Sequence, residues 1–323
     1  MVTPSRRDLV ITAAVAGLAF GLDKPLEFIT PAYAQKTPDP SPAFFKYKVG
    51  TVECTALYDG IWEKAHDPAF ISNASIDDTK QAMRAGGFTP DFVSIPFTVL
   101  VVNTGGKLVL CDSGTGGQLL PTAGKMAANM TAAGIDPAKI GTILISHFHP
   151  DHIFGLMAKD TNAPVYPNAE IIVSAAEYKW WTDPSVIDRL PEARKSLGRR
   201  IQAVFPTWKN IRQVDGEKEV APGIRFVSAP GHTPGHTAFH LSSGNRQLMI
   251  SNDTAYVPAL LMPHPEWHGA YDQDGALAEA TRRKLLDRVI ADKMMIAGYH
   301  FPFPGVATIA KDGNAYAYTP VKA

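Results

Sequence analysis

Short apolar stretches bounded by turn residues recur along most of the chain and predict β-strands. Asp59-Gly60 supplies a turn signal after the first stretch, and the four residues 103–106 form a hairpin connection by composition. Alternation or apolar runs predict strands at 47–58, 97–102, 107–111, 142–145, 170–173, 224–228, 237–241, 247–250 and 294–296.

Segments with helical spacing lie between these strands and after them. They predict helices at 77–85, 122–133, 153–157, 176–181, 185–205 and 275–292, the fifth broken near Pro191. The rest of 66–94 is mixed and predicts a loop or cap. Strands at both ends, with helices between and after them, predict an α/β fold: a four-layer αβ/βα sandwich of two face-to-face sheets with helices outside.

The first 34 residues predict an export signal. Arg6-Arg7, an apolar run from Ile11 to Leu22 and a small-residue site ending at Ala34 resemble a twin-arginine signal, so we expect a periplasmic or secreted protein. Charged residues between 23 and 27 leave an uncleaved anchor as the alternative, although the run is short for a membrane span. We expect no stable membrane insertion after cleavage. A proline-rich lead-in at 35–43 then precedes one hydrolase domain at 44–323.

Composition fits this organisation. The 323 residues are 45% hydrophobic, which is enough for one large domain. The 31 basic and 31 acidic residues form no run of like charge, so we expect no nucleic-acid partner. Cys54 and Cys111 lie in apolar stretches; two buried thiols are the preferred interpretation, with a disulfide as the alternative that an oxidising compartment would permit.

The segment that follows the strand at 142–145 carries four side chains that can bind metals. These are His147, His149, Asp151 and His152, all within six residues. Imidazole and carboxylate together suit zinc and similar divalent ions. Because the segment offers more than one tetrahedral ion needs, it predicts a two-metal centre.

Three further candidates complete the set. His232, Asp253 and His300 each follow a predicted strand, and side chains at strand ends can converge on one edge of a layered fold. A structural zinc site is usually closed by four ligands, so seven candidates favour a catalytic centre.

The spacing of these motifs resembles that of the metallo-β-lactamase superfamily over nearly the whole mature chain. The segments 102–114, 230–237 and 300–305 are especially similar to its exported methyl parathion hydrolase branch, whose relatives include lactone and aryl-ester hydrolases. The resemblance implies the four-layer metallo-β-lactamase fold. It also suggests a homodimer.

The resemblance further implies roles for single residues. His147, His149 and His232 would hold one metal, Asp151, His152 and His300 the other, and Asp253 would bridge them. Zinc is the expected identity of both divalent ions, although manganese, cobalt and iron can share such ligands. Asp112 matches an acid that orients a ligand histidine, whereas Asn252 replaces a glycine that is common before the bridging aspartate.

The expected function is that of a binuclear metal-dependent hydrolase of small neutral esters, either lactones or aryl esters, with phosphotriesters as a further candidate. The expected nucleophile is a metal-bridging hydroxide, with Asp151 as the catalytic residue that guides the proton. No Gly-x-Ser-x-Gly motif suggests a serine nucleophile. The alternatives are a secreted zinc β-lactamase and a metal-binding protein without turnover.

Basic residues shape the substrate expectation. No Lys or Arg lies within 147–152 or the His232 loop, which favours a neutral substrate. Arg282-Arg283-Lys284 is expected on a solvated helix face. The resemblance implies that His236 packs near the ligands without binding metal.

Overall fold

The computed structural model describes residues 43–321. The predicted export signal at 1–34 and all of the lead-in except Ala43 lie outside these residues. Within the described part, no helix is long and apolar enough to cross a membrane.

The N-terminal half of the described chain forms the first seven-stranded sheet. Its strands follow the chain order, β1-β2-β3-β4-β5-β6-β7, and the neighbours from β4 to β7 run parallel. The strands are β1 (Phe44–Val49), β2 (Val52–Ala65), β3 (Phe92–Thr104), β4 (Lys107–Cys111), β5 (Ile140–Ile145), β6 (Glu170–Ser174) and β7 (Ile211–Val214).

The C-terminal half forms the second seven-stranded sheet, in the order β14-β13-β12-β11-β10-β9-β8. Only β11 and β12 pair parallel among its neighbours. The strands are β8 (Glu219–Ala221), β9 (Ile224–Ser228), β10 (Thr237–Ser243), β11 (Arg246–Ile250), β12 (Met295–Ala297), β13 (Val306–Asp312) and β14 (Ala315–Pro320).

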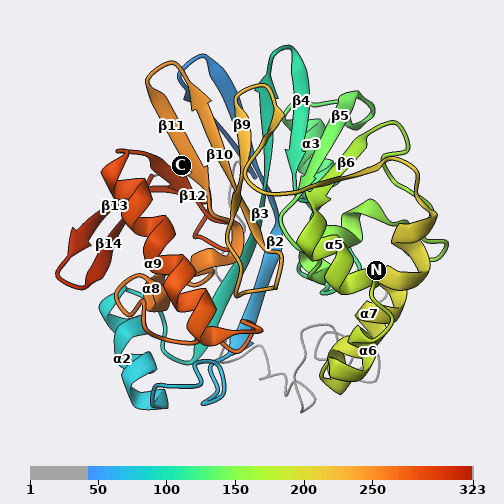
Figure 1. Cartoon of the computed structure of the whole chain (residues 1–323). Helices are drawn as coiled ribbons and strands as arrows, with labels where there is room; N and C mark the ends of the chain where they lie inside the picture. Colours follow the sequence, from blue (N-terminus) through green and yellow to red (C-terminus); the bar gives the residue numbers. More distant parts are fainter. Residues whose placement is uncertain (1–42, 322–323) are drawn as a thin grey trace, which may run out of the picture.

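Helices cover the outer faces of both sheets. Figure 1 shows α9 outside the second sheet and α3 and α5 beside the first. The α-helices are α2 (Ile76–Ala85), α3 (Met126–Ala132), α4 (Pro150–Ile153), α5 (Ala175–Thr182), α6 (Val186–Arg189), α7 (Glu192–Val204), α8 (Pro258–Leu261) and α9 (Gly275–Ala291). Short 3-10 turns are η1 (Pro137–Lys139), η2 (Phe154–Leu156), η3 (Phe205–Thr207) and η4 (Asn252–Ala255).

Alternate residues of the strands face two different cores. In β5, Leu144 points into the core between the sheets, while Ile143 and Ile145 face the helices. In β9, Phe226 faces the inner core and Val227 the outer one. This two-sided burial is what a four-layer sandwich requires, and it confirms the predicted fold class.

The strand directions bring several carboxyl ends to one edge of the molecule. In the first sheet β4 and β5 are parallel neighbours. In the second sheet β9 and β11 are both antiparallel to β10, and β12 runs parallel to β11. Residues that follow β4, β5, β9, β11 and β12 therefore meet at that edge.

The predicted single strand at 47–58 is wrong. The chain turns at Gly50-Thr51, so the segment forms the β1-β2 hairpin, and β2 continues through the Asp59-Gly60 pair as a bulge. Asp59-Gly60 was expected to end the strand. Instead β2 continues through this pair, and its residues are largely buried on both faces before and after it.

Other boundaries shift for local reasons. The helix predicted at 122–133 begins only at Met126, and the one predicted at 153–157 is replaced by α4 and η2, with Pro150 in the first turn of α4. The break near Pro191 is confirmed, since it separates α6 from α7. The unpredicted strands β7, β8, β13 and β14 are short or partly exposed, so they lack a clear apolar run.

The two cysteines are buried free thiols. Cys54 lies in β2 and Cys111 in β4, with β3 between them. The preferred interpretation of the sequence is confirmed, and both side chains act as small apolar groups in the core between the sheets.

Truncation in the core between the sheets tests their packing. Phe239 is fully buried and stacks on Phe226 with ring centroids 5.4 Å apart. We expect Phe239→Ala to lower the free energy of unfolding by about 3–5 kcal/mol in urea titrations, because it leaves a cavity. Ser242→Ala, at an exposed position of the same strand, should change it by less than about 0.5 kcal/mol. Equal effects of both changes would contradict the sandwich.

Candidate metal centre

The segment 147–152 follows β5 at the shared edge of the sheets. His147 lies in the loop, His149 caps α4, and Pro150 in the first turn of that helix presets its direction. Asp151 and His152 then lie within α4 and are both buried. A tight turn into a short helix thus points four polar side chains inward.

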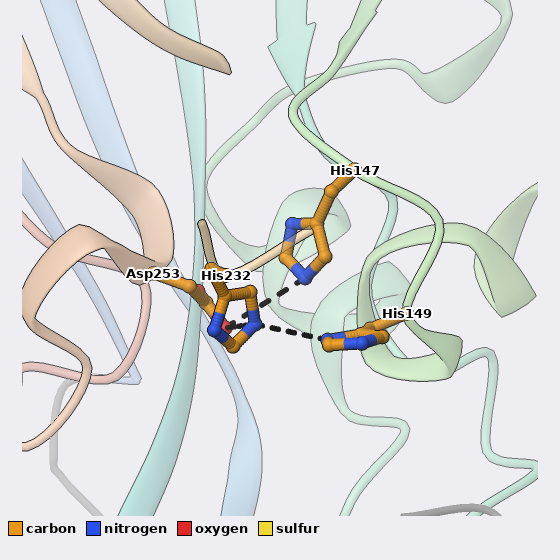
Figure 2. A group of neighbouring side chains, drawn as sticks. All are labelled: His147, His149, His232 and Asp253. Carbon is orange, nitrogen blue, oxygen red and sulfur yellow. Dashed lines mark hydrogen bonds and ion pairs between the residues drawn. The ribbon is translucent and has the colours of Figure 1, made fainter. Parts of the chain in front are cut away.

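The seven candidate ligands converge as two adjoining groups. The ligand atoms within each group lie within 4.8 Å of one another: His147, His149, His232 and Asp253 in the first, Asp151, His152 and His300 in the second. Figure 2 shows the first group, with His147 and His149 from the segment after β5 facing His232 and Asp253 from the second sheet. The structure therefore brings together every predicted site residue, and the grouping is the one that the resemblance implied.

Asp253 lies between the two groups. Its Oδ2 is 3.3 Å from Nε2 of His232 and 3.1 Å from Nε2 of His300, and its Oδ1 is 3.3 Å from Nε2 of His152. One carboxylate thus contacts imidazoles of both groups, which is the geometry that a bridging ligand needs.

Several ligand atoms are buried without a hydrogen bond. Among the described residues, Nε2 of His147, Nε2 of His152 and Oδ1 of Asp253 have no such partner. Buried polar atoms are rarely left unpaired, because their desolvation is uncompensated. A pair of divalent cations would satisfy these atoms, so the residues present fit a two-metal centre.

The outer nitrogens of three rings hydrogen-bond to the surrounding protein, so their inner nitrogens face the other candidate ligands. Nδ1 of His300 donates to the carbonyl of Pro96 at 2.9 Å. Nδ1 of His152 lies 2.8 Å from Oδ2 of Asp112, and Nδ1 of His232 lies 2.9 Å from Oδ1 of Asp272. With the proton held on Nδ1, each Nε2 offers a lone pair to a metal.

Electrostatics mark an excess of negative charge around His152 of the second group. Burial opposes the charged form of His152, yet Asp253, Asp151 and Asp112 outweigh it and raise its pKa well above the usual range. Burial likewise disfavours ionised Asp253, but the imidazoles of His300 and His152 hold the pKa of its carboxyl well below the usual range. A metal cation would take the place of the proton that these acids attract.

Two histidines of the first group, His147 and His149, have the opposite tendency. Burial and, after it, the neighbouring imidazoles of His152 and His149 lower the pKa of His147 well below its usual value. Burial, then His232 and Arg194, do the same to His149. Both rings are therefore neutral at pH 7, which is the form that binds metal.

Asp112 ties the ligand segment to β4. Its Oδ1 accepts from the N–H of Ser146 and its Oδ2 from the Ser146 hydroxyl, both at 2.8 Å, besides the contact to His152. β4 and β5 are parallel neighbours, so the residue after β4 reaches the segment after β5. This contact agrees with the orienting role that the resemblance implied for Asp112.

Asp272 and Arg282 support His232 from behind, and the sequence interpretation missed both. Asp272 contacts His232 through Oδ1 and Arg282 through Oδ2 at 3.3 Å. Arg282 is fully buried and also donates to the carbonyl of Thr254, next to Asp253, at 3.0 Å. The expected solvated helix face at 282–284 is therefore wrong for Arg282, because one turn of α9 packs against the ligand loops.

His236 and Asn252 fix the loop that carries Asp253. Nδ1 of His236 donates to the carbonyl of Ala229, which leaves Nε2 to accept the N–H of Asp253 at 3.2 Å. His236 thus packs beside the ligands, as the resemblance implied. Asn252 has a positive φ of 47°, a conformation that glycine adopts freely and asparagine tolerates better than most residues, which explains how Asn replaces Gly here.

Glu177 joins the two ligand loops, and no sequence motif marked it. This buried carboxylate on α5 accepts the N–H of Phe148 at 2.9 Å, the Thr233 hydroxyl at 2.7 Å and the N–H of Gly235 at 3.0 Å. It also accepts Nε1–H of Trp181 at 2.7 Å. A carboxylate that accepts four hydrogen bonds holds both loops in place. In the sequence, Glu177 was only a single acidic residue in a predicted helix, so nothing indicated this role.

A pocket opens over the ligands. Five candidate ligands line it together with Trp62, Tyr256 and Tyr271, so its walls are partly aromatic. Buried Arg194 of α7 also lines it. The segment 147–152 and the His232 loop contain no Lys or Arg, as the sequence indicated. Arg194 reaches the pocket from α7, which no local sequence motif marked.

Two sheets with a buried pair of metal-ligand groups at one edge define a class of metal-binding proteins. The profile of the metallo-beta-lactamase superfamily matches residues 93–300, which is more than half of the chain. The chain belongs to the metallo-beta-lactamase superfamily.

Individual relatives agree with this class. The chain is 25% identical over 184 residues to an N-acyl homoserine lactonase of Bacillus sp, a match that covers 56% of the chain and 64% of the relative. It is 26% identical over 181 residues to a probable metallo-hydrolase of Mycobacterium tuberculosis (strain ATCC 25618 / H37Rv), covering 49% and 56%. The chain thus spans less than two thirds of the length of these curated relatives.

Solved structures match over more of the chain. AidC, a dizinc quorum-quenching lactonase in complex with a product, has a TM-score of 0.82 and 29% identity, covering 87% of this chain and 98% of its own. The hydrolase AbOPH has a TM-score of 0.78 and 24% identity with the same coverage, which shows a shared fold.

Replacement of Arg282 tests the support behind His232. Arg282→Met should lower the free energy of unfolding by about 3–5 kcal/mol, because it leaves Asp272 buried without its cation. The neighbouring Arg283 is one-third exposed, and Arg283→Met should cost about 1 kcal/mol or less. Urea titration of the three proteins measures both values. A small loss for Arg282→Met would contradict a supporting role.

Metal removal tests the seven-residue centre. Because its ligands follow strands of both sheets, bound metal should stabilise the fold, by about 2.7 kcal/mol when free metal is 100-fold above its dissociation constant. We expect chelation, verified by elemental analysis, to lower the melting temperature in scanning calorimetry. The variant Asp253→Asn should respond much less. A wild-type melting temperature that stays constant would count against the shared centre.

Proposed function

We propose that the protein is a binuclear metal-dependent hydrolase that opens lactones. The observation that carries the proposal is the pair of buried ligand groups bridged by Asp253 beneath a pocket with aromatic walls. The lactonase relative of Bacillus sp and the match to the dizinc lactonase AidC support the choice of substrate class.

The centre would hold one ion with His147, His149 and His232 and the other with Asp151, His152 and His300, with Asp253 shared. Two divalent ions, for which we propose zinc, would activate a water to hydroxide near neutral pH and polarise the ester carbonyl. Seven protein ligands leave no need for a serine nucleophile.

The remaining steps fall to the chain's own residues. Asp151 lines the pocket, and His152 and His300 overcome the effect of its burial to lower the pKa of its carboxyl. It is therefore ionised and can accept a proton from the attacking water and return it to the leaving alkoxide. Tyr256 and Tyr271 stay neutral, because burial raises their pKa values well above 10, and their rings exclude water.

Aryl esters and phosphotriesters are further substrates that the proposal includes, since the same centre can polarise a carbonyl or a phosphoryl oxygen. One observation favours a second candidate function, a zinc β-lactamase. Buried Arg194 in the pocket could pair with the carboxylate that β-lactam antibiotics carry.

Export and dimerisation belong to the same proposal. We propose that residues 1–34 direct the chain out of the cytoplasm through the twin-arginine route, which exports folded proteins and would allow metal loading beforehand. The homodimer stays a prediction from the resemblance. Fractionation of cells and light scattering of the purified protein test these two points.

A substrate panel tests the activity. We expect metal-loaded protein to hydrolyse dihydrocoumarin and γ-lactones faster than phenyl acetate or a phosphotriester, and to leave nitrocefin intact, as followed by pH-stat and absorbance. Asp151→Asn should lower kcat/KM for the lactones by roughly a hundredfold or more, because a metal ligand and a proton carrier are lost together.

The control variant is Asp160→Asn, which changes an exposed acid in the loop after η2 and should keep wild-type rates. Nitrocefin turnover without lactone hydrolysis would favour the β-lactamase. Tight metal binding with no turnover of any substrate would favour a non-catalytic metal-binding protein.

A further inference from the structure

Arg194 is a buried cation with little to bind inside the protein. It lies in the first turn of α7 and is 7% exposed. Its guanidinium donates to the carbonyl of Tyr271 at a long 3.3 Å. Nearby acids are engaged elsewhere, since Glu192 pairs with Lys195 at 2.8 Å and Asp272 with Arg282. Within residues 43–321, no carboxylate forms an ion pair with Arg194.

Such a group calls for a partner, because a guanidinium removed from water loses its hydration and needs compensating acceptors. Arg194 also lines the pocket over the ligands. Other buried cations of the chain show the usual solution: Arg282 donates to three backbone carbonyls and one carboxylate. Arg194 therefore has donors to spare where a substrate would lie.

We infer that Arg194 selects substrates that carry an oxygen acceptor, a carbonyl or a carboxylate, beside the ester bond to be cleaved. The inference rests on the proposed function and names the substrate class of the same site. Arg194 would act as a specificity-determining residue.

The residues that line the pocket suit three parts of such a substrate. The candidate ligands Asp151, Asp253 and His300 would receive the ester bond. The aromatic rings of Trp62 and Tyr271 suit an apolar chain. Arg194 supplies the only guanidinium of the pocket lining described here, and its planar fork fits a carbonyl or carboxylate oxygen.

Two kinds of substrate share this chemistry. A lactone with an acylamino group offers an amide carbonyl, and a lactone with a side-chain carboxyl offers a carboxylate. A lactone with only an alkyl chain offers neither. These three probes separate the sources of the acceptor: N-hexanoyl-α-amino-γ-butyrolactone, γ-carboxy-γ-butyrolactone and γ-nonalactone.

The experiment compares kcat/KM of metal-loaded wild type, Arg194→Met and Arg194→Lys on the three lactones. Arg194→Met should lower kcat/KM roughly ten- to a hundredfold for the acylamino lactone, the carboxy lactone or both, according to which acceptor hydrogen-bonds to Arg194. The alkyl lactone should change less than roughly threefold. Arg194→Lys keeps the charge but lacks the planar guanidinium, so its kcat/KM for the affected lactone should lie between those of wild type and Arg194→Met. Arg199→Met, at an exposed position of the same helix, is the matched control and should keep all rates.

Equal losses on all three lactones, or no loss on any, would overturn the inference. Melting temperatures of the variants separate a folding defect from a binding defect, and Arg194→Gln is a second replacement should Arg194→Met fail to fold.

A binding measurement keeps this inference distinct from the proposed function. Calorimetric titration with N-hexanoylglycine, which carries both acceptors, needs no turnover. We expect wild type and Arg199→Met to bind it alike and Arg194→Met to bind roughly tenfold more weakly or worse. If lactones are not hydrolysed but Arg194→Met still binds N-hexanoylglycine more weakly than wild type, the proposed function is wrong and the inferred acceptor site at Arg194 is supported. Equal affinities, or no binding to wild type, would overturn the acceptor site.

Discussion

The carboxylate of Asp253 is the point on which the site depends. It lies between two groups of buried imidazoles and acids, within 3.1–3.3 Å of nitrogens from His152, His232 and His300. So many polar groups would be costly inside a protein unless something charged satisfied them. The clustering is therefore a structural argument for cations, independent of any relative.

A set of charged groups behind the ligands holds them in place. Asp112 links the ligand segment to β4, the pair Asp272 and Arg282 links His232 to the loop of Asp253, and Glu177 joins the two histidine loops. The side chain of each is buried, and each connects elements that are far apart in the chain. The ligands are thus positioned by the same contacts that fasten the two sheets and their helices at this edge.

The pocket lining combines three kinds of side chain. Candidate metal ligands and aromatic rings both line it, and Arg194 adds a positive charge for which no ion-paired acid is found among the described residues. Ester chemistry needs the first, an apolar acyl or alkyl chain suits the second, and an oxygen acceptor suits the third. This combination supports the proposed lactone substrate with an apolar part and an oxygen acceptor.

The sequence alone determined the layered α/β class and the seven candidate ligands. Apolar runs of β4, β5 and β9 and the compact segment 147–152 are local signals, and each ligand follows an apolar run directly. The sequence did not predict the turn at Gly50-Thr51, because β2 is buried on both faces and lacks alternation. It also did not predict β7, β8, β13 and β14, because these strands are short or partly exposed and lack an apolar run.

Apart from Asp112, only the tertiary structure decided which charges support the site. Glu177, Arg194 and Arg282 lie in helices, where an isolated charged residue normally indicates a solvated surface. All three are buried, because α5, α7 and α9 pack against the ligand loops or the pocket. Local sequence records the residue type, but burial and charge pairing arise between segments far apart in the chain, so they are properties of the packed fold.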